Sequence, residues 1–453
     1  MPAPSESLLT EAPNPTPIRL LKTNADWQDQ FDDDQLQELA RQNFSAKPGQ
    51  HAWVTIDNAP TVVVGCNERA GLHTLGGLPM ALTEGDYQLL DPCAELDVLG
   101  WALGAYQFIR YKDPKRAPAR LVIPDDVDAA RLRATADAVG LGRDLINTPA
   151  ADMAPSHLAA EIEALADEFD AQCTVVRDDA LLDLSCGAIH AVGRAADDPP
   201  LLIDLTWGNP DHPKITVVGK GVTFDSGGLN IKPSGGMRSM KKDMGGAAAA
   251  VALASLIMAQ ALPVRLRLLI PAAENAIAGN AFRPGDILAT HKGLTVEIDN
   301  TDAEGRLLLC DALSIGSEDN PELMVDFATL TGSARSAVGT EIAAMFCNDD
   351  GVASALYDSG VSTDDPVWRM PLHAAYNHML DSKVADLVNS AASPYAGSIT
   401  AALYLQNFVG DTRWVHFDQM AYNTRTRPGR PEGGEAMAMR AVYQYLEQRY
   451  GTA

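Results

Sequence analysis

The sequence predicts an α/β protein of two domains: a small N-terminal α/β domain and a larger C-terminal domain with a mixed, mostly parallel sheet covered by helices. The length of 453 residues exceeds one ordinary domain. An apolar fraction of 46% is typical of a chain with a buried core. From residue 173 onward, short apolar runs alternate with helical patterns, which indicates strands joined by helices around a largely parallel sheet.

The N-terminal domain is predicted over residues 1–124. Its first segment, 1–17, is rich in Pro and Ser and predicts a loose arm. Between 26 and 43, apolar residues recur at helical spacing among many acids, which indicates an amphipathic helix with an acidic face. Two short β-rich runs and one longer helical pattern complete the domain, at 52–56, 61–65 and 96–111.

Residues 125–146 mix acids, alanines and leucines and contain no Gly or Pro before Gly140, so they predict a helix that connects the two domains. The second domain is then expected over 147–453. Its expected strands are 173–177, 201–207, 215–219, 264–270, 294–299 and 323–328, and its expected helices include 247–260 and 307–317.

Polar and charged motifs begin where three of these strands stop. Lys220, Asn300 and Thr329 each come directly after an expected strand. In open α/β sheets, ligands bind at the carboxyl ends of the strands. The sequence therefore predicts that these motifs form one site at that edge of the sheet.

Four carboxylates belong to this site: Asp225, Asp243, Asp302 and Glu304. Without cations they would repel one another, and some would bind protons, whereas two divalent cations would neutralise them. In an extended segment, the alternate spacing of Asp302, Glu304 and Arg306 would place all three side chains on one side. Two metals roughly 3.5–4 Å apart can share and activate one water, so the motifs predict a two-metal hydrolase.

Two lysines accompany the carboxylates. Lys220 could bind a metal only as the neutral amine, which requires that cations and burial lower its pKa. Lys232 lies seven residues beyond Asp225, past the turn-forming Gly227-Gly228, and could remain charged to stabilise an oxyanion.

The most specific phrases of the chain are 219–234, 240–247 and 300–307, the last of which reads Asn-Thr-Asp-Ala-Glu-Gly-Arg-Leu. They closely resemble the leucine aminopeptidase (cytosol aminopeptidase) family of dinuclear metallopeptidases. Further matches extend the similarity over about residues 140–430, at 271–275, 283–286 and 326–332.

The resemblance implies an enzyme that removes N-terminal residues from peptides, binds two divalent metal ions, zinc or manganese, and assembles as a homohexamer. The implied metal ligands are Lys220, Asp225, Asp243, Asp302 and Glu304, with Asp225 and Glu304 bridging. The implied catalytic pair is Lys232 and Arg306, and Arg306 would hold a bicarbonate ion that acts as general base. The implied substrate-binding residues are Met240, Asn300, Ala303, Thr329, Leu330 and Gly332.

Other interpretations of the same residues stay open. A two-metal phosphoesterase would cleave phosphate esters instead of aminoacyl amides. A non-catalytic acidic scaffold or regulator would have no activity for chelators to remove. His416 and Asp418 share one face of an expected strand and could form a triad with Ser226, but a hydrogen-bonded structural histidine is the preferred interpretation.

Composition excludes several partners. A net charge of −25 argues against nucleic acid and anionic membrane surfaces. The six cysteines form no CxxC pair, and the N-terminus has no basic region followed by an apolar core, which together predict a cytoplasmic protein. The apolar run 244–262 is about long enough to span a membrane, but its glycines and alanines favour a helix buried against a sheet.

Overall fold

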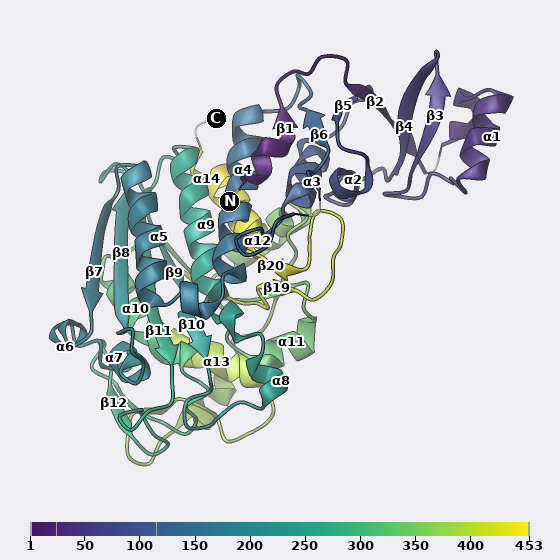
Figure 1. The fold of residues 1–453 in the computed structure, drawn as a ribbon. Helices are drawn as coiled ribbons and strands as arrows, with labels where there is room; N and C mark the ends of the chain where they lie inside the picture. The colour runs from purple at the N-terminus through teal and green to yellow at the C-terminus, as the bar shows by residue number, and fades with distance from the viewer. Residues whose placement is uncertain (1, 24, 115, 452–453) are drawn as a thin grey trace. The chain divides into compact units, whose positions relative to one another are not determined.

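The computed structural model describes residues 2–23, 25–114 and 116–451, and the chain divides into two compact units (Figure 1). Unit 1 comprises Met1–Gly140 and Asn423–Glu432, and unit 2 comprises Leu141–Tyr422 and Gly433–Ala453. Each unit contains its own sheet.

The sheet of unit 1 has six strands in the order β1-β6-β5-β2-β4-β3. Its strand pairs are parallel except for the antiparallel pair of β3 and β4. Apolar residues of β2 and β4, including Ile18, Leu21 and Val63, are fully buried. The elements are η1 (Pro4–Ser7), β1 (Leu8–Leu9), β2 (Thr16–Lys22), η2 (Trp27–Gln30), α1 (Asp33–Arg41), β3 (His51–Ile56), β4 (Ala59–Cys66), α2 (Leu78–Ala81), β5 (Asp86–Leu89), α3 (Glu95–Ala105) and β6 (Arg120–Val122), followed by α4 (Ala129–Asn147).

Residues 4–9 are packed within unit 1, so the prediction of a loose arm over 1–17 is wrong for this segment, and Met1 lies outside the described residues. The backbone N and the Oγ of Ser5 donate hydrogen bonds of 3.0 and 2.7 Å to the two carboxylate oxygens of Asp137. Leu8 pairs with Leu121 in a parallel register and is 2% exposed. Long-range contacts therefore order a segment whose composition alone indicates flexibility.

Two helices of unit 1 differ from their predicted bounds. The helix expected over 26–43 is divided into η2 and α1, because Phe31 is extended with a φ of −130° and Asp32 caps the start of α1. The helix expected over 96–111 is α3, which ends at Ala105 because the next residue is already extended, with a ψ of 132°.

The main sheet of unit 2 has nine strands in the order β16-β15-β18-β14-β9-β11-β8-β7, with β10 paired to β11. Five of its eight strand pairs are parallel and three are antiparallel, so the predicted mixed, mostly parallel sheet is confirmed. The strands are β7 (Gln172–Arg177), β8 (Leu201–Trp207), β9 (Lys214–Gly219), β10 (Gly221–Asp225), β11 (Arg265–Asn275), β14 (Leu323–Ala328), β15 (Ala343–Cys347), β16 (Val367–Arg369) and β18 (Trp414–Asp418).

Helices cover both faces of this sheet. A Cβ at Gly219 of β9 would lie 2.6 Å from the Cα of Ala247, so α9 packs closely on one face. A Cβ at Gly316 of α10 would lie 3.1 Å from Cγ2 of Thr216, which points to the opposite face of the same strand. Figure 1 shows α5 and α9 in front of the sheet. The remaining elements are η3 (Ala150–Asp152), α5 (Pro155–Glu168), α6 (Ala180–Asp183), α7 (Gly187–Gly193), α8 (Ser234–Met237), η4 (Met240–Met244), α9 (Gly245–Ala259), α10 (Gly305–Glu318), α11 (Gly332–Val338), α12 (Asp350–Ser362), η5 (Ala374–Leu380), α13 (Gly397–Gln406), β19 (Tyr422–Asn423), β20 (Gly433–Gly434) and α14 (Met439–Tyr450).

The apolar run that could span a membrane by length and composition is a core helix. It corresponds to Met240–Ala259, with a mean hydropathy of 1.3, and 89% of its apolar stretch is buried inside the protein. The expectation of a helix buried against the sheet is confirmed.

The strand expected over 294–299 is β13 (Thr295–Glu297), which does not belong to the main sheet. It forms a three-stranded sheet with antiparallel β12 (Ile287–Ala289) and parallel β17 (Leu387–Val388). Because parallel strands end at the same edge, the residues that follow β13 and β17 meet in space. The pattern of apolar runs in the sequence also fails to predict β10 as a separate strand, since only Lys220 separates it from β9.

Candidate active site

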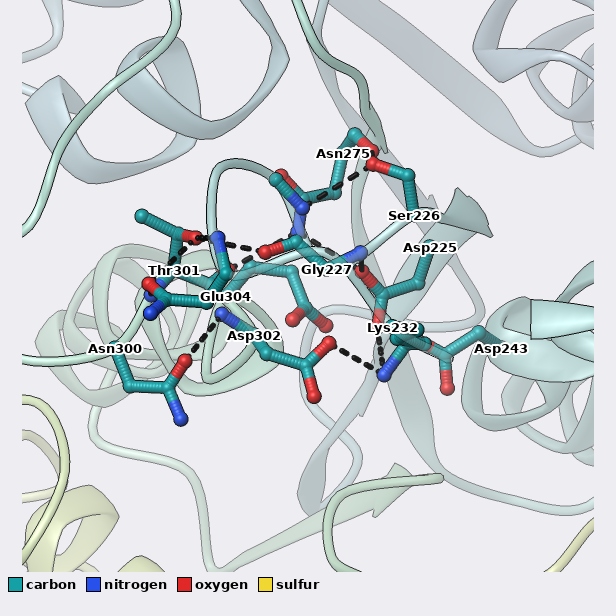
Figure 2. A network of polar contacts seen from close by, with 12 residues as sticks. Asp225, Ser226, Gly227, Lys232, Asp243, Asn275, Asn300, Thr301, Asp302 and Glu304 are labelled. Carbon is teal, nitrogen blue, oxygen red and sulfur yellow. Dashed lines mark hydrogen bonds and ion pairs between the residues drawn. The ribbon is translucent and has the colours of Figure 1, made fainter. Parts of the chain in front are cut away.

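The charged motifs converge in unit 2 as expected. Lys220 lies between β9 and β10, Asp225 is the last residue of β10, and Asp243 belongs to η4. Asp302 and Glu304 lie between β13 and α10. Figure 2 shows the carboxylates of Asp225, Asp302 and Glu304 turned toward a common centre.

The carboxylates are close together and shielded from water. One oxygen from each of Asp225, Asp302 and Glu304 lies within 4.8 Å of the other two. Asp225, Asp243 and Glu304 are at most 3% exposed, whereas Asp302 is half-buried. A cluster of this kind is costly unless positive charge balances it.

Two ammonium groups lie between these carboxylates. Lys220 Nζ is 2.7 Å from Asp243 Oδ2 and 3.0 Å from Glu304 Oε1. Lys232 Nζ is 2.8 Å from Asp225 Oδ2 and 2.5 Å from Asp302 Oδ1 (Figure 2). Burial lowers the pKa of Lys220, but its carboxylate neighbours outweigh this effect and raise the pKa above its ordinary value.

The two lysines do not balance four carboxylates. Burial and the neighbouring Asp225 raise the pKa of Glu304 to about 8, and burial and Asp243 raise the pKa of Asp225. Glu304 Oε2 is buried and has no hydrogen-bond partner among the described residues. An oxygen-rich cluster with excess negative charge and an unpaired buried oxygen fits divalent cations.

The segment from Asp302 to Arg306 is not extended, so the predicted alternation is wrong. Glu304 has helical angles, φ −76° and ψ −33°, and α10 begins at Gly305. A side chain at Gly305 would collide with the aliphatic part of Lys220, which explains why the helix begins with glycine here. The carboxylates of Asp302 and Glu304 converge through a turn and a helix start instead of a strand.

Arg306 lies in the first turn of α10 and is 7% exposed. Its Nη1 donates a 2.6 Å hydrogen bond to the carbonyl oxygen of Asn389. Its Nε is buried, and neither Nε nor Nη2 has a hydrogen-bond partner among the described residues. Burial lowers the pKa of this guanidinium.

Other residues support the cluster from outside: Asn275 follows an expected strand near the site and is a candidate for this role from the sequence, whereas Thr301 and Asn389 were not assigned to it. Asn275 Nδ2 donates to Asp225 Oδ1 at 2.8 Å and to the carbonyl of Thr301 at 3.0 Å. The hydroxyl of Thr301 donates to the carbonyl of Gly227 at 2.7 Å (Figure 2). Asn275 and Thr301 lie inside the recognised phrases, which is a usable signal, whereas Asn389 lies outside them.

Of the positions that the resemblance assigns to substrate, Thr329 contacts a carboxylate of the cluster directly. Thr329 Oγ1 donates a 2.8 Å hydrogen bond to Asp243 Oδ1, and the backbone N of Leu330 donates to Asp418. Gly332 begins α11 and is exposed.

The other assigned positions come from η4 and from the loop before α10. Met240 is 8% exposed. Asn300 Oδ1 accepts a 2.9 Å hydrogen bond from the backbone N of Asp302. Ala303 is half-buried and uses its carbonyl to accept from Asn389.

The residues of the alternative triad do not meet. Ser226 Oγ donates to the carbonyl of Asn275 at 2.6 Å, and His416 Nδ1 lies 2.6 Å from Asp326 Oδ1 inside the sheet. Asp418 accepts hydrogen bonds from the backbone N of Leu330 and of Thr331. His416 is therefore a buried structural histidine, as preferred from the sequence.

Comparisons with known proteins agree with this geometry. The family model described as "Cytosol aminopeptidase family, catalytic domain" matches residues 140–443, and the model described as "M17 aminopeptidase, N-terminal domain" matches residues 16–124. A probable cytosol aminopeptidase of Brucella melitensis is 40% identical over 388 residues, which cover 82% of this chain and 78% of the relative. A probable cytosol aminopeptidase of Geotalea uraniireducens is 38% identical over 366 residues, which cover 77% and 74%.

Solved structures are similar over nearly the whole chain. The cytosol aminopeptidase from Coxiella burnetii has a TM-score of 0.94 at 47% identity, covering 98% of this chain and all of that one. The bottromycin maturation enzyme BotP in complex with Mn has a TM-score of 0.86 at 34% identity, covering 96% and 99%. Neither the comparisons nor the site supports the phosphoesterase or the scaffold. The chain belongs to the cytosol aminopeptidase family, and it is a metal-dependent aminopeptidase.

Proposed function

We propose that the site holds two divalent cations, zinc or manganese, and that it uses them to remove single N-terminal residues from peptides. The observation that carries this proposal is the buried carboxylate cluster, in which Glu304 Oε2 has no hydrogen-bond partner among the described residues. The manganese complex of the similar BotP structure supports manganese as one choice. The residues that would hold the cations are Lys220, Asp225, Asp243, Asp302 and Glu304.

The bound groups would supply the reactive chemistry: cations at this site polarise a carbonyl and generate a nucleophile from water at neutral pH, and a bicarbonate ion provides a base. Lys220 would bind a cation as the neutral amine, because the charge of the cations replaces its proton between Asp243 and Glu304. Lys232 is more exposed, with 15% of its side chain accessible, and it would remain charged and stabilise the oxyanion of the substrate.

Arg306 would hold the bicarbonate ion. Its Nη1 is already bonded to the carbonyl of Asn389, which leaves the edge formed by Nε and Nη2 available. The same edge of Arg267 binds both carboxylate oxygens of Asp204 in this protein, at 3.1 and 2.7 Å. A planar anion with two oxygens on one side matches this edge in the same way.

The substrate would lie beside the cluster, against the six positions named above. By resemblance we also propose a homohexamer in the cytoplasm. Sedimentation velocity of the purified protein tests the hexamer.

The proposed boundaries are 1–124 for the N-terminal domain, 125–146 for the connecting helix and 147–453 for the catalytic domain.

A free α-amine on the substrate is expected to be required for cleavage. One cation would bind that amine, so its acetylation removes a ligand from the productive complex. We expect turnover of aminoacyl amides and no detectable turnover of their N-acetylated forms, measured as amine release with manganese or zinc added. Efficient cleavage of acetylated peptides, with aminoacyl amides left intact, would contradict an aminopeptidase mechanism.

Lys232→Met is expected to retain both metals and to lose about a hundredfold in kcat, as the loss of one oxyanion donor does. Lys220→Met is expected instead to lower the affinity of one metal position. Metal content and kcat of both variants are compared with those of Lys383→Met, which changes an exposed lysine. Equal metal loss in the Lys232 and Lys220 variants would refute the separation of their roles.

A further inference from the structure

Asn389 is a fully buried residue next to the three-stranded sheet of β12, β13 and β17. It directly follows β17, which runs parallel to β13. The backbone N of Asn389 donates a 2.9 Å hydrogen bond to the carbonyl of Glu297, the last residue of β13. This pairing places Asn389 beside the loop that carries Asp302 and Glu304.

Both the oxygen and the nitrogen of the Asn389 side-chain amide form hydrogen bonds with that loop. Its Oδ1 accepts hydrogen bonds from the backbone N of Asp299 at 2.9 Å and of Asn300 at 3.2 Å. Its Nδ2 donates to the carbonyls of Asn300 at 2.7 Å and of Ala303 at 3.3 Å. A single side-chain amide thus holds four backbone groups of one short loop. No other side chain of similar size combines two N–H donors with a carbonyl acceptor.

The backbone of Asn389 acts on Arg306. Its carbonyl oxygen accepts the 2.6 Å hydrogen bond from Nη1, so the guanidinium is held on the side away from the Nε and Nη2 edge. The same residue therefore fixes both the loop of the metal ligands and the direction of the anion-binding edge. If the bond to Nη1 were absent, Arg306 could turn and satisfy Nε with another acceptor.

We infer that Asn389 is a positioning residue for the anion site of this aminopeptidase, which it builds by locking the loop 299–303 and directing the free edge of Arg306 toward the anion. This inference rests on the proposed role of Arg306. Asn389 touches neither of the reacting atoms in our assignment, and it acts through Arg306 and the loop.

Asn389→Ala keeps the carbonyl that accepts from Arg306 but loses the four side-chain hydrogen bonds that hold the loop around it. The variant is expected to keep both metals and to raise the bicarbonate concentration that gives half-maximal activity about tenfold, because the carbonyl is no longer held in place. KM for the aminoacyl amide should change by a smaller factor, because the Asn389 side chain reaches the proposed substrate positions Asn300 and Ala303 only through their backbone groups. In hydrogen exchange, the amides of Asp299 and Asn300 should exchange faster, since they lose their acceptor. Because Asn389 acts through Arg306, the double variant Asn389→Ala/Arg306→Ala should show the same absence of bicarbonate dependence as Arg306→Ala alone.

The matched control is Asn348→Ala. The side-chain amide of Asn348 also holds a single backbone segment, accepting from the backbone N of Trp414 and donating to the carbonyl of Thr412, but at the opposite end of the main sheet. It should leave metal content and bicarbonate dependence unchanged. If Asn389→Ala does not fold, Asn389→Ser is measured in the same way.

The outcomes separate this inference from the proposed function. Faster exchange in Asn389→Ala with an unchanged bicarbonate response would overturn the inference and leave the anion role of Arg306 intact. A parent enzyme that is indifferent to bicarbonate would overturn both. Loss of metal from Asn389→Ala at the same rate as loss of activity would show that the residue supports the metal ligands and not the anion.

Discussion

Glu304→Ala is expected to abolish aminopeptidase activity and to lower the bound metal at the same time. Glu304 is 1% exposed, contacts Lys220 at 3.0 Å, and keeps one carboxylate oxygen free of hydrogen bonds among the described residues. Removing this group takes away a ligand and a full negative charge from a site that must hold two cations. Metal content by elemental analysis and kcat should fall together.

Asp302→Ala is expected to behave similarly, because its carboxylate lies within 4.8 Å of those of Asp225 and Glu304. The matched control is Asp299→Ala, an exposed carboxylate three residues earlier on the same loop. Its backbone N bonds to Asn389 and is unchanged by the substitution. Full activity of Glu304→Ala after exhaustive chelation would end the two-metal proposal.

Arg306→Ala is expected to slow turnover by about 10²–10⁴-fold, the range that general base catalysis supplies, while both metals stay bound. Among the described residues, no histidine forms a hydrogen bond or ion pair with the clustered carboxylates: His416, for example, is fully buried and bonds to Asp326. The free edge of Arg306 is therefore the group placed to recruit a base from solution. Arg306→Lys keeps the charge but loses the fork of two parallel donors, so it should recover only a small part of the rate.

Bicarbonate depletion should slow the parent enzyme and leave Arg306→Ala unaffected. Arg283→Ala, which changes an exposed arginine, serves as the control for a general loss of positive charge. A variant without Arg306 that retained the parent rate would assign the base to another group, with Glu304 or a terminal water as the next candidates.

The convergence of the charged residues could be predicted from the sequence because each one lies in a short, specific phrase. Lys220 and Asp225 belong to one phrase, and Asp302 and Glu304 to another, so their grouping needs only two loops to meet. The main sheet was also predictable, since the strands 201–207 and 323–328 match β8 and β14 without change. Apolar runs of this kind are buried wherever the sheet forms.

Local patterns failed where long-range contacts decide the conformation. The Pro- and Ser-rich first residues read as a loose arm, yet Ser5 bonds to Asp137, 132 residues away. The alternation of charges from Asp302 to Arg306 read as a strand, but this segment is a turn and a helix start packed against Lys220. Periodicity cannot show which neighbour a segment will meet.

The sequence by itself determined the chemistry of this protein: an acidic, oxygen-rich site with two lysines and one arginine is a matter of residue types in specific phrases. Only the tertiary structure decided how that chemistry is held. Asn389 reaches Asp299 and Arg306 across 90 and 83 residues because β17 pairs with β13 in a separate small sheet. That pairing depends on backbone hydrogen bonds between distant segments. Because many strand sequences can form such bonds, no local sequence pattern specifies which two strands will pair.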